Sequence, residues 1–186
     1  MGFDIFGIPH FLDCAMKSLP VELSTPQSAT EWEAAEGILR EYGDSLGIDL
    51  SFQGFESELH SLPGAYAAPR GTLLLAWVDG ELAGCCALRP LDEVDTVNAA
   101  EMKRLYVRPA FRRFGLGRLL AEAVLDAARQ IGYSSVLLDT LDDMEAARGL
   151  YESLGFVEVP PFYFNPIPGA HYLKAELGGF RQSYLG

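Results

Sequence analysis

The sequence predicts one α/β domain, with a mixed central sheet of about six to seven strands and helices on both faces. Strand-like and helix-like segments alternate along the chain. Asp79-Gly80 separates the apolar runs TLLLAWV and ELAGCCALR, which is a strong signal for an antiparallel hairpin. The segment EMKRLYVRPAFRRFGLGRLL, residues 101–120, then predicts a strand, a basic turn and the glycine-rich start of a long helix.

The first elements follow from local patterns. Residues 19–24 predict a strand. Thr30-Glu31-Trp32-Glu33 matches a capping box at the start of a helix, and the apolar residues behind it share one helical face. These are Ala35, Ile38, Leu39 and Tyr42. Residues 56–62 predict a second, short helix that Pro63-Gly64 ends.

After the hairpin, residues 100–107 predict the next strand. The following helix keeps apolar residues at helical spacing and stops at Gly132. Its apolar positions are Leu116, Leu119, Leu120, Ala123, Val124, Ala127 and Ile131. Residues 135–139 predict a short buried strand.

One helix and two strands complete the domain. Asp142 and Glu145 are the expected caps of a helix that ends at Gly155. Residues 156–159 and 171–177 predict the last two strands. The loop between them, PPFYFNPIPG, is rich in proline and too rigid for a flexible linker. We expect an N-terminal extension over 1–17 and a single domain over 18–186.

The glycine turn carries the first functional signal. Arg112-Arg113-Phe114-Gly115-Leu116-Gly117 fits R-x-x-G-x-G at a helix start, where free N–H groups and the helix dipole favour an anion. A Walker A loop is excluded because no lysine follows Gly117. The dinucleotide fingerprint is excluded because Leu120 stands where it needs glycine. A purely structural turn remains the alternative to a polyphosphate site.

Three segments together resemble the Gcn5-related N-acetyltransferase (GNAT) superfamily. EMKRLYVRPAFRRFGLG is similar to its acetyl-CoA pyrophosphate motif, SSVLLDT to the following strand, and AARGLYESLGF to the next helix and strand start. The likeness covers about residues 70–177 well. It implies a GNAT-like sheet and an acetyl-CoA-dependent N-acetyltransferase, with acetyl-CoA as co-substrate.

The resemblance also implies roles for individual residues. The backbone N–H of Leu105 is the expected oxyanion donor, and Val107 is expected to bond the pantetheine arm. The full set expected to bind the cofactor is Leu105, Tyr106, Val107, Arg112, Arg113, Phe114, Gly115, Leu116, Gly117 and Arg118.

Two side chains are expected to take part in catalysis. By resemblance, Tyr151 faces the CoA sulfur, where its phenol would hydrogen-bond the leaving thiolate. Packing in the core is the alternative for Tyr151. Glu101 stands where several family members place a general base; the alternative is a structural carboxylate paired with Lys103 or Arg104.

Two features depart from the family pattern or add nothing to it. Many relatives carry an asparagine after the strand at 135–139, whereas this chain has Thr140-Leu141-Asp142-Asp143. His10, His60 and His171 are far apart in sequence, and none has a partner that suggests a triad or a metal site. His171 opens the last strand and could still line the acceptor pocket.

The acceptor is expected to be a small-molecule amine or an amino-acid-like amine, attacked directly in a ternary complex. The pocket around it would be aromatic and mostly neutral, formed by Phe52, Phe55, His60, Tyr66, Phe162, Tyr163, Phe164, Asn165 and Tyr172. A protein or peptide acceptor is one alternative. Another is a non-catalytic module that senses acyl-CoA or docks a partner.

Composition limits the other classes of function. The net charge is −12, from 26 acidic and 14 basic residues, so nucleic acid is not an expected partner. Six basic residues cluster around the glycine turn, between Lys103 and Arg118. No apolar run reaches membrane-spanning length, and neither a metal site nor a disulfide framework is expected from Cys14, Cys85 and Cys86. A reducing cytoplasm is the expected compartment, and aromatics in the last strands would suit a homodimer.

Overall fold

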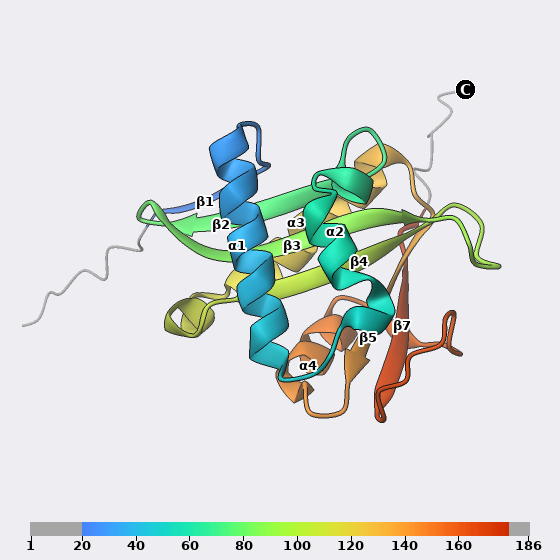
Figure 1. Ribbon diagram of the computed structural model, residues 1–186. Helices are drawn as coiled ribbons and strands as arrows, with labels where there is room; N and C mark the ends of the chain where they lie inside the picture. Colours follow the sequence, from blue (N-terminus) through green and yellow to red (C-terminus); the bar gives the residue numbers. More distant parts are fainter. Residues whose placement is uncertain (1–19, 179–186) are drawn as a thin grey trace, which may run out of the picture.

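The computed structural model describes residues 20–178, without the side chain of Arg113. The expected extension over 1–17, with His10 and Cys14, lies outside this range. Seven strands form one sheet in the order β1-β2-β3-β4-β5-β7-β6. Figure 1 shows this sheet, with colours that follow the sequence from β1 in blue to β7 in red. Their bounds are β1 Val21–Ser24, β2 Thr72–Val78, β3 Glu81–Leu91, β4 Ala99–Val107, β5 Ser135–Leu141, β6 Val157–Glu158 and β7 Ala170–Glu176.

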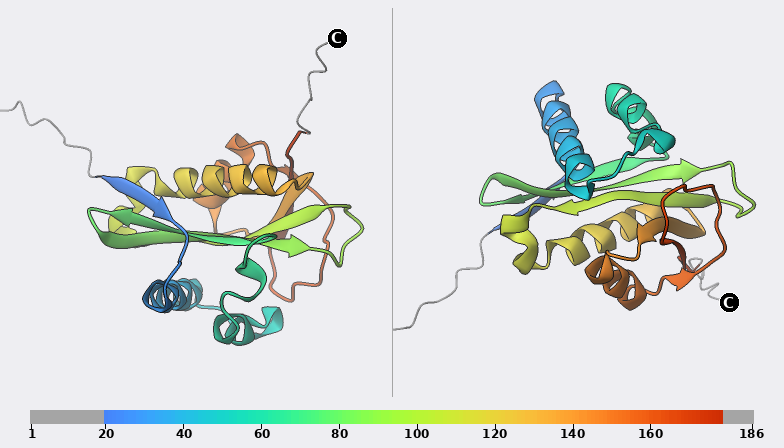
Figure 2. Two further views of the ribbon diagram at one scale, coloured as in Figure 1. Left: turned by 90° about the horizontal axis from the view of Figure 1, so that it is seen from above. Right: turned by 60° about the horizontal axis from the view of Figure 1, so that its bottom comes forward.

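The helices cover both faces of this sheet, as predicted. Helices α1 (Ala29–Leu46) and α2 (Phe55–His60) lie on one face, and α3 (Leu116–Ile131) and α4 (Glu145–Ser153) lie on the other (Figure 2). Three short 3-10 helices occur in the connections, η1 Ser51–Gln53, η2 Gly64–Tyr66 and η3 Pro109–Phe114. Within residues 20–178, no helix is both long and apolar enough to cross a lipid bilayer.

Each face has its own apolar core. The core on the α3 side gathers apolar residues of α3 with alternate residues of the strands, such as Val136 and Leu138 of β5. The core on the α1 side contains Ala35, Ile38 and Leu39, the helical face that the sequence predicts. Cys85 and Cys86 are fully buried on opposite faces of β3, where each packs in one of the two cores.

The hairpin and the long helix form as predicted. Asp79 and Gly80 both adopt positive φ, 50° and 80°, which a tight two-residue turn between β2 and β3 requires. Helix α3 ends at Gly132, whose φ of 100° few other residues adopt without strain. These signals are local in sequence, so they determine local structure directly.

The caps of α1 and α4 differ from the prediction. Ser28, rather than Thr30, caps α1: its hydroxyl accepts from the Glu31 N–H at 3.3 Å, and the Glu31 carboxylate accepts from the Ser28 N–H at 2.9 Å. Both serine and threonine stand three residues before a glutamate, and the helix uses the earlier pair. Asp142 does not cap α4, whose N-cap is Met144 without a side-chain hydrogen bond.

The joint between β4 and β5 determines where a site can form. All neighbouring strands are antiparallel except this pair, which is parallel and aligned over three residue pairs only, Ala99–Ser135 to Glu101–Leu137. Beyond these pairs the two strands diverge (Figure 1). Arg104 has a φ of 59°, and the register of β4 against β3 shifts there, so a bulge turns β4 at the point where it leaves β5.

Candidate active site

A narrow cavity fills the opening between β4 and β5 and extends to both faces of the sheet. Its free volume is about 60 Å³. A space of this size holds about two water molecules, so only a slender group can enter it. Met102 to Leu105 of β4 form one wall, and Asp139 to Leu141 of β5 form the other. Tyr151 closes the side towards α4, and Phe52 and Gln53 close the side towards α2.

The glycine turn stands at the wide end of this opening. Gly115 has a φ of 70° and precedes α3 without a side-chain cap. The hydrogen bond from the Leu119 N–H to the Gly115 carbonyl, at 3.2 Å, opens α3, and the N–H groups of the first helical turn, Leu116 to Arg118, have no partner further along the helix. A Cβ placed on Gly117 would make only an ordinary contact, 3.8 Å from Leu150. The turn therefore offers an open, positively polarised helix end to an anion.

The basic residues around the turn divide into two groups, which corrects the single cluster expected from the sequence. Arg112 and Arg118 are exposed beside the helix start. Arg108 instead binds Glu41 at 2.6 Å, and Lys103 and Arg104 are buried under α2. The sequence places all six within sixteen residues, but side chains alternate across a strand, and the bulge turns β4.

Contacts connect the turn to α4. The Arg118 guanidinium donates to the Ser153 hydroxyl at 2.7 Å, and Gly117 faces Leu150. Tyr151 lies between these two residues of α4 and points into the cavity wall. A molecule that places an anion on the turn can therefore extend towards Tyr151 along the opening of the sheet.

Tyr151 is buried, with 7% of its surface exposed, and packs edge-on against Phe156. Within the described part of the chain, no group hydrogen-bonds its hydroxyl, and the side chain lines the cavity. Burial raises the pKa of this phenol well above 10. Tyr151 thus stays protonated at neutral pH and can donate a hydrogen bond to a group in the cavity.

Comparison with known proteins identifies this arrangement. The model of the acetyltransferase (GNAT) family matches residues 33–156, which include the opening, the glycine turn and Tyr151. The chain belongs to the GNAT family. An acetyl-CoA-dependent N-acetyltransferase is therefore the enzyme class of this protein, as the sequence predicts.

Relatives and solved structures agree with that assignment. An uncharacterized N-acetyltransferase of Schizosaccharomyces pombe is 36% identical over 163 residues, 87% of this chain and 98% of the relative. An acetyltransferase from Streptococcus agalactiae has the same fold, with a TM-score of 0.68, 20% identity, and coverage of 84% of this chain and 98% of that one. The PaiA N-acetyltransferase of Thermoplasma acidophilum, solved with coenzyme A, has a TM-score of 0.63 at 17% identity, covering 85% and 99%.

Glu101 of this GNAT protein lies where the strands are still paired, at the closed end of the opening. Only 1% of its side chain is exposed. One carboxylate oxygen accepts from Arg89 at 2.7 Å, and the other lies 3.3 Å from Lys103 Nζ. The pairing with Lys103 that the sequence left open as an alternative is therefore present, and Arg104 takes no part in it.

Arg104 belongs to a separate buried ion pair. Its guanidinium donates to both carboxylate oxygens of Glu58, at 2.9 and 3.0 Å, and lies over the ring of Phe55. Burial disfavours the charged form of Glu58, but the hydrogen bonds and charge of Arg104 outweigh it and lower the pKa of that carboxyl. This pair attaches α2 to β4.

Two polar side chains that line the cavity, Gln53 and Asp139, are absent from the site residues expected from the sequence, whereas Asn165 was expected beside the acceptor. The Gln53 amide accepts from Lys103 at 3.1 Å and from Arg104 at 2.7 Å, and donates to the Tyr163 hydroxyl at 3.2 Å. Asn165 donates to Asp139 at 3.3 Å. Only Asp139 carried a signal in the sequence, as a carboxylate that ends a buried strand.

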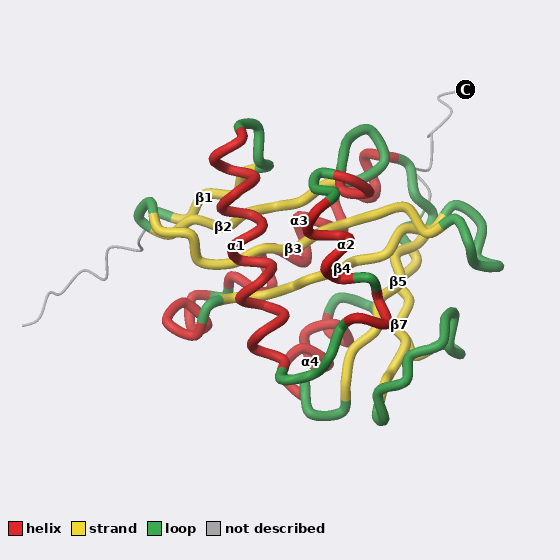
Figure 3. The backbone as a smooth tube through the Cα atoms, in the orientation of Figure 1, coloured by secondary structure: helices red, strands yellow, loops and turns green. Residues whose placement is uncertain are grey.

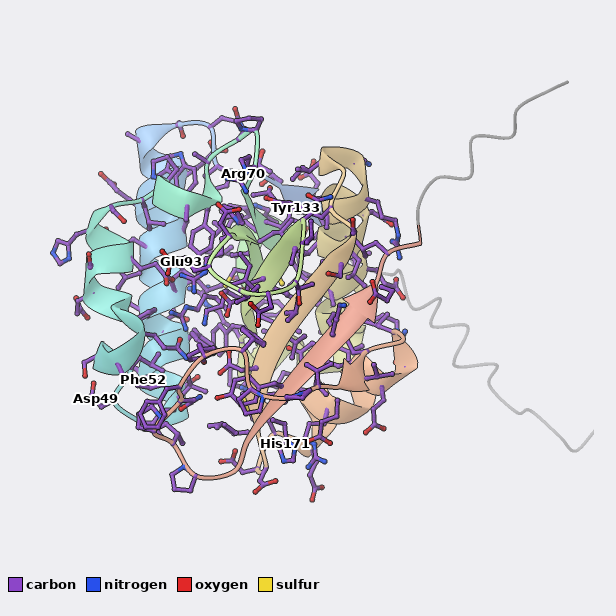
Figure 4. All side chains as sticks on the ribbon, turned by 90° about the vertical axis from the view of Figure 1, so that its right-hand side faces the viewer. Asp49, Phe52, Arg70, Glu93, Tyr133 and His171 are labelled. Carbon is purple, nitrogen blue, oxygen red and sulfur yellow. The ribbon has the colours of Figure 1, made fainter. Side chains whose placement is uncertain are left out.

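A second cavity, of about 260 Å³, lies next to the first and shares Phe52, Gln53 and Lys103 with it. Its other walls come from the β3–β4 turn and the β6–β7 loop, and are Arg89, Leu91, Glu93, Val94, Glu101, Phe162 and Tyr163. Phe52 and Glu93, which line it, are labelled in Figure 4. Of the nine residues expected around the acceptor, Phe52, Phe162, Tyr163 and Asn165 line one or both cavities.

His171 has partners that the sequence did not reveal. Its ring nitrogens lie 2.6 Å from Asp142 and 2.9 Å from Glu158, at the lower end of β7 in Figure 4. His171 lines neither cavity. The sequence does not reveal these two carboxylates, because β5, β6 and β7 bring together residues that are distant in sequence. Residues 20–178 contain no group of His, Cys, Asp and Glu arranged to hold a metal ion.

Proposed function

We propose that this GNAT protein transfers the acetyl group of acetyl-CoA to the primary amine of a small or amino-acid-like molecule, by direct attack in a ternary complex. The observation that carries the proposal is the line of contacts from the uncapped start of α3, through Gly117–Leu150 and Arg118–Ser153, to α4, whose Tyr151 lines the opening between β4 and β5. The pyrophosphate of acetyl-CoA would lie at the helix start, its pantetheine arm in the opening of the sheet, and its thioester beside Tyr151.

The fit of the cofactor follows from groups along this path. The N–H groups at Gly115 to Arg118, with Arg112, Arg113 and Arg118, would hold the pyrophosphate. Tyr106 and Val107, at the end of β4, would flank the pantetheine arm. The N–H of Leu105 follows the bulge and would donate to the carbonyl oxygen, where negative charge develops during attack.

Tyr151 would assist the leaving group. Because burial keeps its phenol protonated, its hydroxyl would donate a hydrogen bond to the thiolate as the carbon–sulfur bond breaks. Two carboxylates are candidates for the general base that accepts the amine proton: Asp139, which lines the first cavity, and Glu101, which lines the second.

The size of the second cavity supports a small acceptor. Its volume of about 260 Å³ is below the roughly 300–1,000 Å³ of sites for drug-sized ligands. Aromatic and aliphatic side chains form much of its wall, while Arg89, Glu93, Glu101 and Lys103 bring charges of both signs. This lining suits an amine with an apolar body and few charges.

The first test is titration of the purified protein with acetyl-CoA by calorimetry, followed by a screen of amino acids, polyamines and aromatic amines for release of the CoA thiol. We expect saturable binding and turnover with at least one amine. Binding without any turnover would favour an acyl-CoA sensor over an enzyme. Absence of binding by a folded sample would contradict the proposal.

Gly117→Glu tests the glycine turn. The new side chain would bring bulk and negative charge to the place proposed for the pyrophosphate, so we expect acetyl-CoA binding to fall below detection in calorimetry. Gly37→Glu is the matched control, because Gly37 is also a helical glycine with open space around it, on α1. Equal affinity in both variants would remove the turn from the site.

A further inference from the structure

We propose that Asp139 is the group that binds the acceptor ammonium and takes its proton. This inference rests on the proposed function and assigns one of its steps to a residue. Asp139 lies on β5 where β4 has already diverged, and it lines the same cavity as Tyr151 and Leu105. Its side chain is 13% exposed, so it is sheltered but can be reached.

Asp139 and Tyr151 approach this cavity from opposite faces of the sheet. Val136 and Leu138 of β5 pack in the core on the α3 side, so the alternate residue Asp139 points to the α2 side. There it lies 3.7 Å from Lys103 Nζ, which in turn binds Gln53 of η1. Tyr151 belongs to the core on the α3 side. An amine arriving from the α2 side would meet Asp139, while the thiolate would leave towards Tyr151.

Glu101 is less suited to this step. It borders the second cavity but not the one that contains Tyr151 and Leu105. Both of its oxygens are engaged by cations, one by Arg89 at 2.7 Å and the other by Lys103 at 3.3 Å. If this carboxylate took a proton, the positive charges of Arg89 and Lys103 would lose the negative charge that compensates them. Glu101 therefore acts as a positioning residue that fixes Lys103.

Asp139 has weaker contacts, which leave capacity for a ligand. Lys103 lies beyond hydrogen-bond distance of one oxygen, and the neutral Asn165 amide donates to the other at 3.3 Å. A carboxylate offers about four lone-pair positions, so it can accept further hydrogen bonds from an ammonium. The Tyr163 hydroxyl lies beside Asn165 and Gln53 and completes the polar edge of the cavity.

The chemistry then balances as follows. The acceptor ammonium gives one proton to Asp139, which passes it to solvent. The freed nitrogen forms a bond to the thioester carbon, and the carbon–sulfur bond breaks. The second nitrogen proton ends on the CoA sulfur, so that the products are the amide, the CoA thiol and one proton in solution. A general base contributes about 10²–10⁴-fold to such a step.

Asp139→Asn tests the assignment because it preserves shape and an oxygen for Asn165. Two nucleophile probes separate the roles: propylamine, which is protonated at neutral pH, and hydroxylamine, which is largely uncharged. We expect the variant to lose about 10²–10⁴-fold in kcat/KM with propylamine. Hydroxylamine transfer and the Kd of acetyl-CoA should change less than about threefold. Asp142→Asn, an exposed change three residues away, is the matched control.

Each outcome is informative. Equal losses with both probes would mean that Asp139 only shapes the cavity, and no loss with either would remove it from the reaction. If Glu101→Gln lost more kcat/KM with propylamine than Asp139→Asn did, and kept its activity with hydroxylamine, Glu101 would be the general base. If the parent protein binds acetyl-CoA but acetylates neither the probes nor any amine of the screen, the proposed function itself fails, whereas a parent that is active beside an unaffected Asp139→Asn variant overturns the inference alone.

Discussion

At the scale of single residues, burial gives Tyr151 its chemistry. A phenol in water is a weak acid with a pKa of about 10. Inside the sheet, the cost of placing a charge in apolar surroundings raises that pKa further. The residue can therefore supply a hydrogen bond at neutral pH, but it cannot act there as a reservoir of phenolate.

Tyr151→Phe should lower kcat and leave the Kd of acetyl-CoA nearly unchanged. A hydrogen bond to a charged group contributes about 1.5–3 kcal/mol, which corresponds to a loss of about 10–10²-fold in kcat. Steady-state kinetics with the best amine, together with calorimetry, would measure both quantities. Tyr133→Phe is the control, since Tyr133 is a buried tyrosine whose hydroxyl binds the Arg70 carbonyl far from the cavity (Figure 4). Equal kcat in parent and Tyr151→Phe would assign Tyr151 to the core alone.

The residues of the candidate site differ in how far sequence could predict them. Tyr151 and Gly117 belong to short motifs whose spacing is local, so their neighbourhood can be inferred without the fold. Gln53, Asp139 and Asn165 meet only because η1, β5 and the β6–β7 loop converge (Figure 3). The sequence around any one of these three residues does not indicate that the other two lie beside it. Their chemical roles, like those of Glu101 and the glycine turn, stay predictions until measured.

At the scale of elements, a cluster of side chains connects β7 to the β5–α4 turn. His171 lies between Asp142 and Glu158, and the backbone N–H of Asp142 donates to the Gly169 carbonyl at 2.9 Å. Arg148 lies 3.9 Å from Asp142 and disfavours the charged histidine. The hydrogen bond to Asp142, followed by that to Glu158, raises the pKa of His171 above its usual 6.5.

The sign of this shift gives a pH dependence. A histidine with a raised folded-state pKa contributes stability that is complete below about 6.5 and is lost as the pH rises through the higher folded value. Denaturant unfolding between pH 6 and 9 should show the parent losing more stability than His171→Gln. The effect should be small because the carboxylates are exposed. His60→Gln removes a histidine outside the cluster and should behave like the parent. A parent and a His171→Gln variant with parallel profiles would contradict the expectation.

The ends of the helices and strands show which sequence signals determine an element's boundary and which do not. The Asp79-Gly80 hairpin and the end of α3 at Gly132 were predictable because each depends on backbone angles that few residues adopt. The start of α1 was not, because two possible capping boxes overlap and the helix begins at the earlier one, with Ser28 as its N-cap. Asp142 had the right residue type for a cap, but His171 engages it instead.

At the scale of the whole molecule, both described cysteines report on unfolding. Cys85 and Cys86 have no exposed surface, and burial raises the pKa of the Cys85 thiol to about 12. In a Cys14→Ser background, we expect no reaction with a thiol reagent in the native protein and reaction of both thiols after denaturation. Labelling rates in increasing urea would measure global opening. Rapid labelling of the native state would mean that this part of the sheet opens locally.

The net charge of the chain and the clustering of basic residues in the sequence say little about which charges lie at the site. The excess of acidic residues is a property of the surface, whereas the basic residues between Lys103 and Arg118 divide between the interior and the helix start. Length and composition predicted one mixed domain, and the order of elements predicted the layers. The divergence of β4 and β5 depends on pairing between distant segments, which composition does not encode.

That divergence also affects how the molecule holds together. In the described part of the chain, the arm β1-β2-β3-β4 joins the arm β5-β7-β6 through three aligned residue pairs. A ligand that fills the opening touches both arms and supplies contacts that the strands themselves do not make. Ligand at a hundred times its Kd stabilises the folded state by about 2.7 kcal/mol. At the proposed site, release of product would remove these contacts and binding of the next acetyl-CoA would restore them, so resistance to unfolding is expected to vary through the catalytic cycle.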